Sequence, residues 1–219
     1  MTYKVEVAKL FFRREDSFFQ IREAERLTGL WKRILLFLVL SMLVFGFTSW
    51  KGLGMEPLSW QATDWSFATY ESMKFFFLTG RLIYALLFSL VILFFTPFIF
   101  WIFTGIPYRK LIIVQLNVLF LMLIERLLWV GFVQYAGLDW FLSPLSFGII
   151  TALITDHVWT IYLFGAISLV QLWAMWFQTK ALVDFSAIKK WKMAILVFFL
   201  HLFYWAASAT LAYYDLYLF

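Results

Sequence analysis

Long runs of apolar residues alternate with short polar segments along most of this chain. Each of five runs is long enough to cross about 30 Å of hydrocarbon, since a helix rises about 1.5 Å per residue. The five runs lie at Ile34–Trp50, Leu82–Thr104, Leu111–Gln134, Val158–Thr179 and Met193–Tyr214. The pattern predicts an all-α, polytopic membrane helix bundle with five transmembrane helices over residues 34–219. Residues 1–33 are predicted to form a basic, amphipathic segment ahead of the bundle.

The positions of Lys and Arg predict the orientation of these helices. Fourteen basic residues precede the first run, join the second to the third, or join the fourth to the fifth, against three on the opposite side: Lys51, Lys74 and Arg81. Cytoplasmic loops carry an excess of Lys and Arg, so we expect a cytoplasmic N-terminus and an external C-terminus. The candidate cytoplasmic basic surface consists of Arg13, Arg14, Arg22, Lys32, Arg33, Arg109, Lys110, Lys189 and Lys190.

Three further segments are partly apolar but are not predicted to cross. Val5–Leu27 mixes charges with Phe and Leu, which is typical of a cytoplasmic helix in the lipid headgroup region. We expect Trp60–Thr79 to form a short re-entrant or interfacial helix outside. Leu142–Thr155 is expected to lie at or dip into the outer interface. If it crossed instead, there would be six spans, and the charge pattern after the fourth run would contradict the orientation.

Composition supports a membrane protein. The chain of 219 residues is 64% hydrophobic and 14% charged, whereas a soluble domain has about 45–50% apolar and about 25% charged residues. The formal net charge of +5 is explained by the orienting Lys and Arg residues, so no nucleic-acid partner is expected. The absence of Cys excludes disulfides, thiolate metal sites and cysteine nucleophiles. We also expect no cleavable signal peptide, because Met1–Arg33 lacks a leading apolar run.

Two charged residues, Glu125 and Arg126, lie within the third run. A charge in mid-membrane costs about 2.5–3.5 kcal/mol on insertion scales, so each should face protein or water. Neighbouring side chains leave a helix about 100° apart and do not pair easily. We therefore expect a partner elsewhere, with Arg81, Asp156 and His157 as candidates. The pair could form a polar gate or a contact with a partner helix, or a buried ion pair that fixes helix packing.

Uncharged polar residues form the second group of candidates: Gln115, Asn117, Gln171, Gln178 and His201. Side-chain amides join membrane helices through hydrogen bonds worth about 0.6–2 kcal/mol. We interpret the amides as interhelical bonds and His201 as a neutral packing residue. The alternatives are a transport pathway lined by the amides and a proton relay through His201.

The chain offers few groups for catalysis. It has two His and no Cys, and it contains no G-x-S-x-G, H-E-x-x-H or Walker sequence. Asp156 and His157 could supply two metal ligands, which is too few for a closed site. We expect a non-enzyme without cofactor or metal. A membrane enzyme acting on lipid would need a polar pocket near Asp156, His157 and Glu125.

Several segments follow a pattern shared by one family of membrane proteins. They are the N-terminal FFRREDSFFQIREAE, the five runs, SPLSFG, and YLFGAISLVQLWAMWFQTKALVDFSAIKKWKMAIL, where an apolar helix leads through a basic turn into the last one. In these segments the chain resembles the YIP family, the Ypt/Rab-interacting-protein-like membrane proteins, in its bacterial branch. The Asp-Leu-Tyr-Gly-Pro motif of eukaryotic members is absent, which favours a bacterial cytoplasmic membrane over a role in vesicle trafficking.

The resemblance implies a function without catalysis. Bacterial YIP-like proteins resemble accessory subunits, some associated with ABC-type exporters. We therefore expect an accessory membrane protein that binds a partner complex in the lipid bilayer, with self-association into a homo-oligomer as an alternative. The main rival is a small transporter or channel with a polar path along the third helix, lined by Gln115, Asn117, Glu125 and Arg126.

Overall fold

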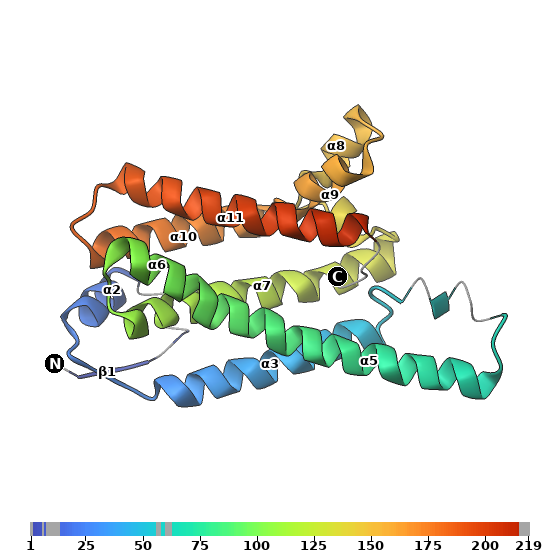
Figure 1. The fold of residues 1–219 in the computed structure, drawn as a ribbon, viewed down its shortest axis with the longest axis horizontal. Coiled ribbons are helices and arrows are strands. Elements are labelled where there is room, and N and C mark those ends of the chain that lie inside the picture. Colours follow the sequence, from blue (N-terminus) through green and yellow to red (C-terminus); the bar gives the residue numbers. More distant parts are fainter. Residues whose placement is uncertain (1, 6, 8–13, 56–57, 60–62, 215–219) are drawn as a thin grey trace. The chain divides into compact units, whose positions relative to one another are not determined.

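The computed structural model describes residues 2–5, 7, 14–55, 58–59 and 63–214, and these are almost wholly helical (Figure 1). Among the described residues, four helices are long and apolar enough to cross a membrane: Leu30–Trp50, Phe67–Thr104, Tyr108–Ala136 and Lys190–Tyr213. The prediction of an all-α, multi-pass membrane protein is confirmed at this level.

The chain divides into two compact units. Unit 1 comprises Met1–Val39, Phe88–Met122 and Val170–Phe203, and unit 2 comprises Leu40–Leu87, Leu123–Leu169 and Tyr204–Phe219. Five of the described helices contribute residues to both units: α3 (Leu30–Trp50), α5 (Phe67–Leu90), α7 (Tyr108–Ala136), α10 (Leu169–Phe185) and α11 (Lys190–Tyr213).

The first half of α7 forms the centre of unit 1. Every residue from Leu111 to Leu119 is buried. Such a helix has no lipid-facing stripe, because neighbours cover it on all sides. These neighbours include α3, where Phe37 packs edge-on against Phe120 at 6.1 Å between ring centroids. They also include α10 (Leu169–Phe185), whose Gln178 bonds to Gln115.

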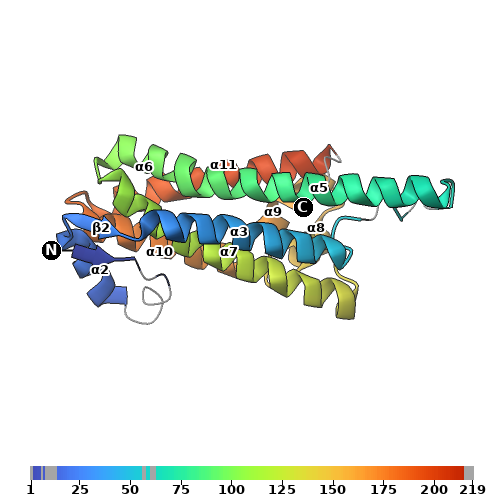
Figure 2. The same ribbon diagram turned by 90° about the horizontal axis from the view of Figure 1, so that it is seen from below.

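The N-terminal part of unit 1 contains a strand pair that the sequence did not predict. β1 (Thr2–Lys4) pairs in parallel with β2 (Arg26–Thr28), and α2 (Arg14–Glu23) lies between them in the chain (Figure 2). A parallel pair needs such a crossover connection. The ring of Phe18 in α2 lies 5.5 Å from that of Phe177 in α10. We expected Val5–Leu27 to form a headgroup helix; only its α2 part is a described helix, and residues 6 and 8–13 lie outside the described residues.

A π-helical turn interrupts the second long helix. α5 (Phe67–Leu90) continues through η1 (Val91–Phe95) into α6 (Thr96–Thr104). Pro97 follows this turn and has no N–H to donate to the preceding helical turn, which explains the altered bonding. The helix ends at Gly105, whose φ of 67° suits a residue without Cβ.

The separate outer helix expected at Trp60–Thr79 is wrong in its described part. Residues Phe67–Thr79 belong to α5, which is continuous from Phe67 to Leu90. The polar Thr69, Ser72 and Thr79 do not break it, since the Ser72 and Thr79 hydroxyls donate to carbonyls four residues earlier. Residues 60–62 lie outside the described residues.

The fourth predicted span, Val158–Thr179, is not one helix. It is divided into α9 (Val158–Ala166) and α10 by a break at Ile167 and Ser168. Residues around the break pair with an earlier segment: the Phe147 N–H donates to the Ile167 carbonyl at 3.1 Å, and the Leu169 N–H donates to the Leu145 carbonyl at 2.9 Å. These bonds to extended backbone replace helical ones, so the helix ends and restarts.

The segment Leu142–Thr155 is too short to cross. It contains α8 (Gly148–Ile154), seven residues long, which corresponds to about 10 Å of helix. Figure 1 shows α8 and α9 as adjacent short helices within unit 2. Phe141, the middle residue of η2 (Trp140–Leu142), packs on Tyr162 of α9 at 4.9 Å between ring centroids.

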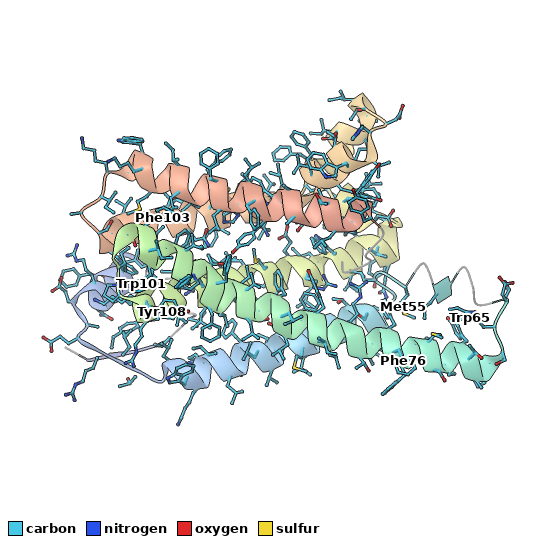
Figure 3. All side chains as sticks on the ribbon, viewed as in Figure 1. Met55, Trp65, Phe76, Trp101, Phe103 and Tyr108 are labelled. Carbon is cyan, nitrogen blue, oxygen red and sulfur yellow. The ribbon has the colours of Figure 1, made fainter. Side chains whose placement is uncertain are left out.

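Large apolar side chains are exposed along the long helices of both units. Phe76 of α5 is 65% exposed, and Phe103 of α6 is 64% exposed. Figure 3 shows Trp101, Phe103 and Tyr108 near the turn that joins α6 to α7. Exposed apolar area of this extent in a soluble monomer would promote association, whereas in a bilayer it faces lipid.

Candidate functional site

Three polar side chains form a hydrogen-bonded chain inside unit 1. The Gln178 Nε2 of α10 donates to the Gln115 Oε1 of α7 at 3.0 Å. The Gln178 Oε1 lies 2.8 Å from the His201 Nε2 of α11. An amide oxygen can only accept, so the Nε2 of His201 carries the proton. All three residues are at most 2% exposed, and the chain joins three helices at one level.

The other predicted amides do not extend this chain. Asn117 donates from its Nδ2 to the Ile113 carbonyl of its own helix at 3.0 Å. It is fully buried, and its Oδ1 has no hydrogen-bond partner in the described structure. Gln171 is half-buried in α10, two turns before Gln178. The structure therefore groups Gln115, Gln178 and His201, while Asn117 bonds locally.

Arg126 lies in unit 2 and is 5% exposed. Its Nε donates to the Thr48 Oγ1 of α3 at 3.2 Å. Its guanidinium carbon lies 3.7 Å from the centroid of the Phe45 ring and 6.0 Å from that of Trp129. Its Nη2 is buried without a hydrogen-bond partner. The side chain is held by cation–π contacts and one hydroxyl.

Two further charged residues in unit 2 are buried. Arg81 of α5 and Glu125 of α7 are each 3% exposed. Arg81 donates from its Nη2 to the Gly54 carbonyl at 3.4 Å, and its guanidinium lies 4.8 Å from the centroid of the Phe77 ring. The charges of Arg81 and Arg126 are close enough to act on each other and on Tyr84. Among its described residues, unit 2 thus buries the guanidinium groups of Arg81 and Arg126 and the carboxyl of Glu125.

Asp156 and His157 are not partners of Arg126. Both are exposed just before α9, and the His157 Nδ1 lies 3.0 Å from the Thr160 Oγ1. No group of three or more His, Cys, Asp or Glu residues that could hold a metal occurs in the part of the chain described by the structure. In the turn after α7, partial burial raises the pKa of Asp139 above its ordinary value.

The predicted basic surface falls entirely in unit 1. Fourteen of the 18 Lys and Arg residues belong to this unit by sequence. Arg22, Lys32, Arg109, Lys189 and Lys190 are exposed. Two half-buried members donate to backbone carbonyls distant in sequence: the Lys110 Nζ to the Arg22 carbonyl at 2.6 Å, and the Arg33 Nε to the Val5 carbonyl at 3.2 Å. Arg13, and the side chain of Arg14, lie outside the described residues.

Comparison with family models, with curated proteins and with solved structures found no match to this chain. The site is therefore interpreted from its own geometry. Two polar groups emerge: the hydrogen-bonded chain Gln115–Gln178–His201 in unit 1, and the arginine cluster in unit 2. We define this cluster as Arg81 and Arg126, with Thr48 and Phe45, which contact Arg126, and Tyr84, which packs on Phe45. The four residues proposed for a single transport path, Gln115, Asn117, Glu125 and Arg126, divide evenly between the two units.

Sequence reasoning missed the rings and the hydroxyl that hold Arg126. Phe45 and Thr48 carry no signal in the sequence, because an apolar helix contains many such residues. Trp129 could have been found, since residues three apart lie on the same face of a helix. The hydrogen bond from Gln178 to Gln115, 63 residues apart, required the tertiary structure.

Proposed function

We propose that this chain is a non-catalytic accessory membrane protein that binds a partner membrane complex, such as an ABC-type exporter, and supports its assembly or activity. The observation that carries the proposal is the use of the polar side chains inside unit 1. Gln115, Gln178 and His201 bond to one another across three helices. Such bonds fix helix packing and leave the exposed apolar faces for lipid and for other helices.

We propose five membrane crossings, made by the four long helices and by α10. This helix has 17 residues, which corresponds to about 25 Å, close to the thickness of a thin bilayer. The basic residues support a cytoplasmic location for the helix ends that belong to unit 1, and hence an external C-terminus. The bacterial cytoplasmic membrane and the YIP resemblance remain predictions from the sequence.

Cysteine labelling tests this orientation, and the chain contains no native Cys to interfere. Ala187→Cys places a thiol at an exposed position between α10 and α11, and Ser66→Cys places one at an exposed position before α5. In intact cells, a membrane-impermeant maleimide should label only the Ser66 variant, and the Ala187 variant should react after permeabilisation. The reverse pattern, or labelling of both in intact cells, would contradict the orientation.

Affinity purification tests the function. The tagged chain, expressed at its native level and extracted in mild detergent, should recover a permease and an ATPase identified by mass spectrometry. Replacing the exposed Lys189 and Lys190 by Gln should reduce recovery if the basic surface contributes, whereas Lys51→Gln serves as a control from unit 2. Recovery of this chain alone would refute the proposal.

The buried charges of unit 2 favour a transporter or channel as the second candidate. Buried intramembrane charges often mark ion or substrate pathways, and Arg81, Glu125 and Arg126 are all buried. Purified protein in liposomes should then conduct or transport solute, and Glu125→Gln should abolish the flux. Flux unchanged by this variant, or no flux at all, would reject this candidate.

A further inference from the structure

Three long apolar helices, α3, α7 and α11, begin in unit 1 with exposed cations and with no acid in the first turn. We define the helix-start cations as Lys32 of α3, Arg109 of α7, and Lys189, Lys190 and Lys192 at the start of α11. The N-terminus of a helix carries a partial positive charge, so a cation there is disfavoured by its own helix. A favourable partner for these cations therefore has to lie outside the three helices.

The acids of unit 1 do not supply this partner. Every Asp and Glu of the unit except Asp184 precedes Arg26 in the sequence, and one of them, Glu23, forms an ion pair with Arg22 at 3.2 Å. For this reason we do not count the cations in and directly after α2. In the described part of the chain, none of the five helix-start cations forms an ion pair. Their positive charge is left for a partner outside the protein.

Contacts within unit 1 join the three helix starts to the same N-terminal segment. Near the start of α3, the Arg33 Nε donates to the Val5 carbonyl at 3.2 Å. At the start of α7, the Lys110 Nζ donates to the Arg22 carbonyl of α2 at 2.6 Å. Phe185, at the end of α10, lies 5.6 Å between ring centroids from a phenylalanine of α2, and α11 follows after a short turn. The helix-start cations thus belong to one end of unit 1.

Exposed tryptophans mark the level of these cations along α3 and α11. Trp31 is 69% exposed and Trp191 is 59% exposed, and the Lys192 Nζ lies 5.7 Å from the centroid of the Trp191 ring. Trp is enriched where hydrocarbon meets the headgroups. One turn further, the exposed residues are apolar, namely Leu35 and Ile195. Cation, Trp and aliphatic side chain follow one another as phosphate, interface and acyl chain do in a phospholipid, an order that a soluble acidic partner would not require.

We propose that the helix-start cations form a docking surface for the headgroups of anionic phospholipids. Ammonium and guanidinium groups form charge-assisted hydrogen bonds with phosphate oxygens. Clusters of four to eight Lys and Arg residues beside a membrane helix attract anionic lipids. The surface lies wholly in unit 1 and applies to either orientation across the bilayer. Lipid binding here goes beyond the accessory role, because it requires no partner protein.

Thermal unfolding of the purified full chain in an uncharged detergent tests this surface. Tryptophan fluorescence reports unfolding, since the chain has 12 Trp. At a hundredfold excess over Kd, phosphatidylglycerol should raise the Tm by about 5–10 °C. Phosphatidylcholine with the same acyl chains, inorganic phosphate and a polyglutamate peptide should each change the Tm little. In about 1 M salt, where the Debye length is about 3 Å, most of the shift should disappear.

Two double variants with the same loss of charge separate this surface from general attraction. Removing two cations should weaken binding about 25-fold, since each contributes about fivefold. At the same lipid concentration, Lys190→Gln with Lys192→Gln should therefore shift by only about 2–4 °C. Lys51→Gln with Lys74→Gln, in unit 2, should keep the full shift. Lys51 is a close match, because its Nζ lies 5.1 Å from the centroid of the Trp50 ring at the other end of α3.

A third double variant tests whether the other two helices contribute to the same surface. Lys32→Gln with Arg109→Gln should reduce the shift as much as the α11 pair does. All these positions except Lys74 are exposed, and Lys74 is half-buried, so each variant should unfold near the wild-type temperature when no lipid is added. Native mass spectrometry with equal amounts of the two lipids should show more retained phosphatidylglycerol on the wild type than on either unit 1 variant.

The proposal is overturned if phosphatidylcholine stabilises the wild type as well as phosphatidylglycerol, or if neither lipid does. An equal shift with inorganic phosphate would indicate a soluble anion instead, and an equal shift with polyglutamate would indicate an acidic protein segment. It is also overturned if the unit 1 variants keep the full shift, or if the unit 2 control loses as much. These measurements use no partner, so a failure of lipid binding and a failure of the accessory role are distinguishable.

Discussion

Replacing Gln178 by Leu should destabilise the protein strongly for a substitution that preserves side-chain volume. Gln178 makes two buried hydrogen bonds, to Gln115 at 3.0 Å and to His201 at 2.8 Å. Double-mutant cycles in membrane proteins give about 0.6 kcal/mol per such bond, with a maximum near 1.7 kcal/mol. Losing both bonds should lower the free energy of unfolding by about 1–3.5 kcal/mol. The loss also leaves the Oε1 of Gln115 and the N–H of His201 buried without the partner they had.

Thermal unfolding in mild detergent, followed by tryptophan fluorescence, measures this effect. For a chain of this length, each kcal/mol shifts the Tm by about 2–4 °C, so Gln178→Leu should lower it by about 2–14 °C. Gln134→Leu provides the matched control, because that side chain is exposed and makes only a 3.4 Å bond to the Lys51 carbonyl. The control should change the Tm little.

The same hydrogen-bonded chain predicts strong non-additivity. Removing the three bonded side chains together can be nearly neutral, since none of their mutual hydrogen bonds then leaves one partner behind. The triple variant Gln115→Leu, Gln178→Leu, His201→Phe should therefore be more stable than Gln178→Leu alone. If Gln178→Leu unfolds at the wild-type temperature, or if the triple variant loses the sum of three separate effects, the reasoning is refuted.

Two further substitutions test the packing of the fold. Gly148→Ala should destabilise the α8–α9 region by about 1–3 kcal/mol, because the added Cβ would overlap the backbone oxygen of Phe141. Limited proteolysis should then cut this variant between α8 and α9. The control variant Gly131→Ala, which has open space around the added carbon, should resist proteolysis as the wild type does. Tyr108→Phe should lower the free energy of unfolding by about 1 kcal/mol, since the phenol donates to the Phe94 carbonyl in the π turn at 2.9 Å; an unchanged Tm would show that this bond is not needed.

Helix existence was predictable where an apolar run was long and uninterrupted. The runs beginning at Ile34, Leu111 and Met193 correspond to α3, α7 and α11, each starting within a few residues of the predicted position. The prediction was wrong elsewhere. It separated residues 60–79 from the run beginning at Leu82, but α5 is continuous from Phe67 to Leu90, and the Ser72 and Thr79 hydroxyls bond to carbonyls of that helix. Helix capping and helix propensity depend on neighbouring residues, so they could not show that α5 is one continuous helix.

The break at Ile167 and Ser168 has no clear sequence signal. Neither residue is Gly or Pro, and the apolar run continues through both. The break depends on pairing with residues 145–147, about twenty positions earlier. Only contacts distant in sequence decide it, so a periodicity argument over Val158–Thr179 could not find it.

By itself, the sequence indicated that lipid surrounds most of this protein and that its structure is therefore helical. A chain that is 64% hydrophobic satisfies its backbone inside hydrocarbon by forming helices. Tertiary structure alone decided which polar side chains meet: that Gln178 bridges Gln115 and His201, and that Arg126 stacks on a ring rather than pairing with an acid. The physical reason is that the composition and length of the apolar runs decide which segments enter hydrocarbon, whereas a hydrogen bond or a cation–π contact requires two groups to lie within bonding distance.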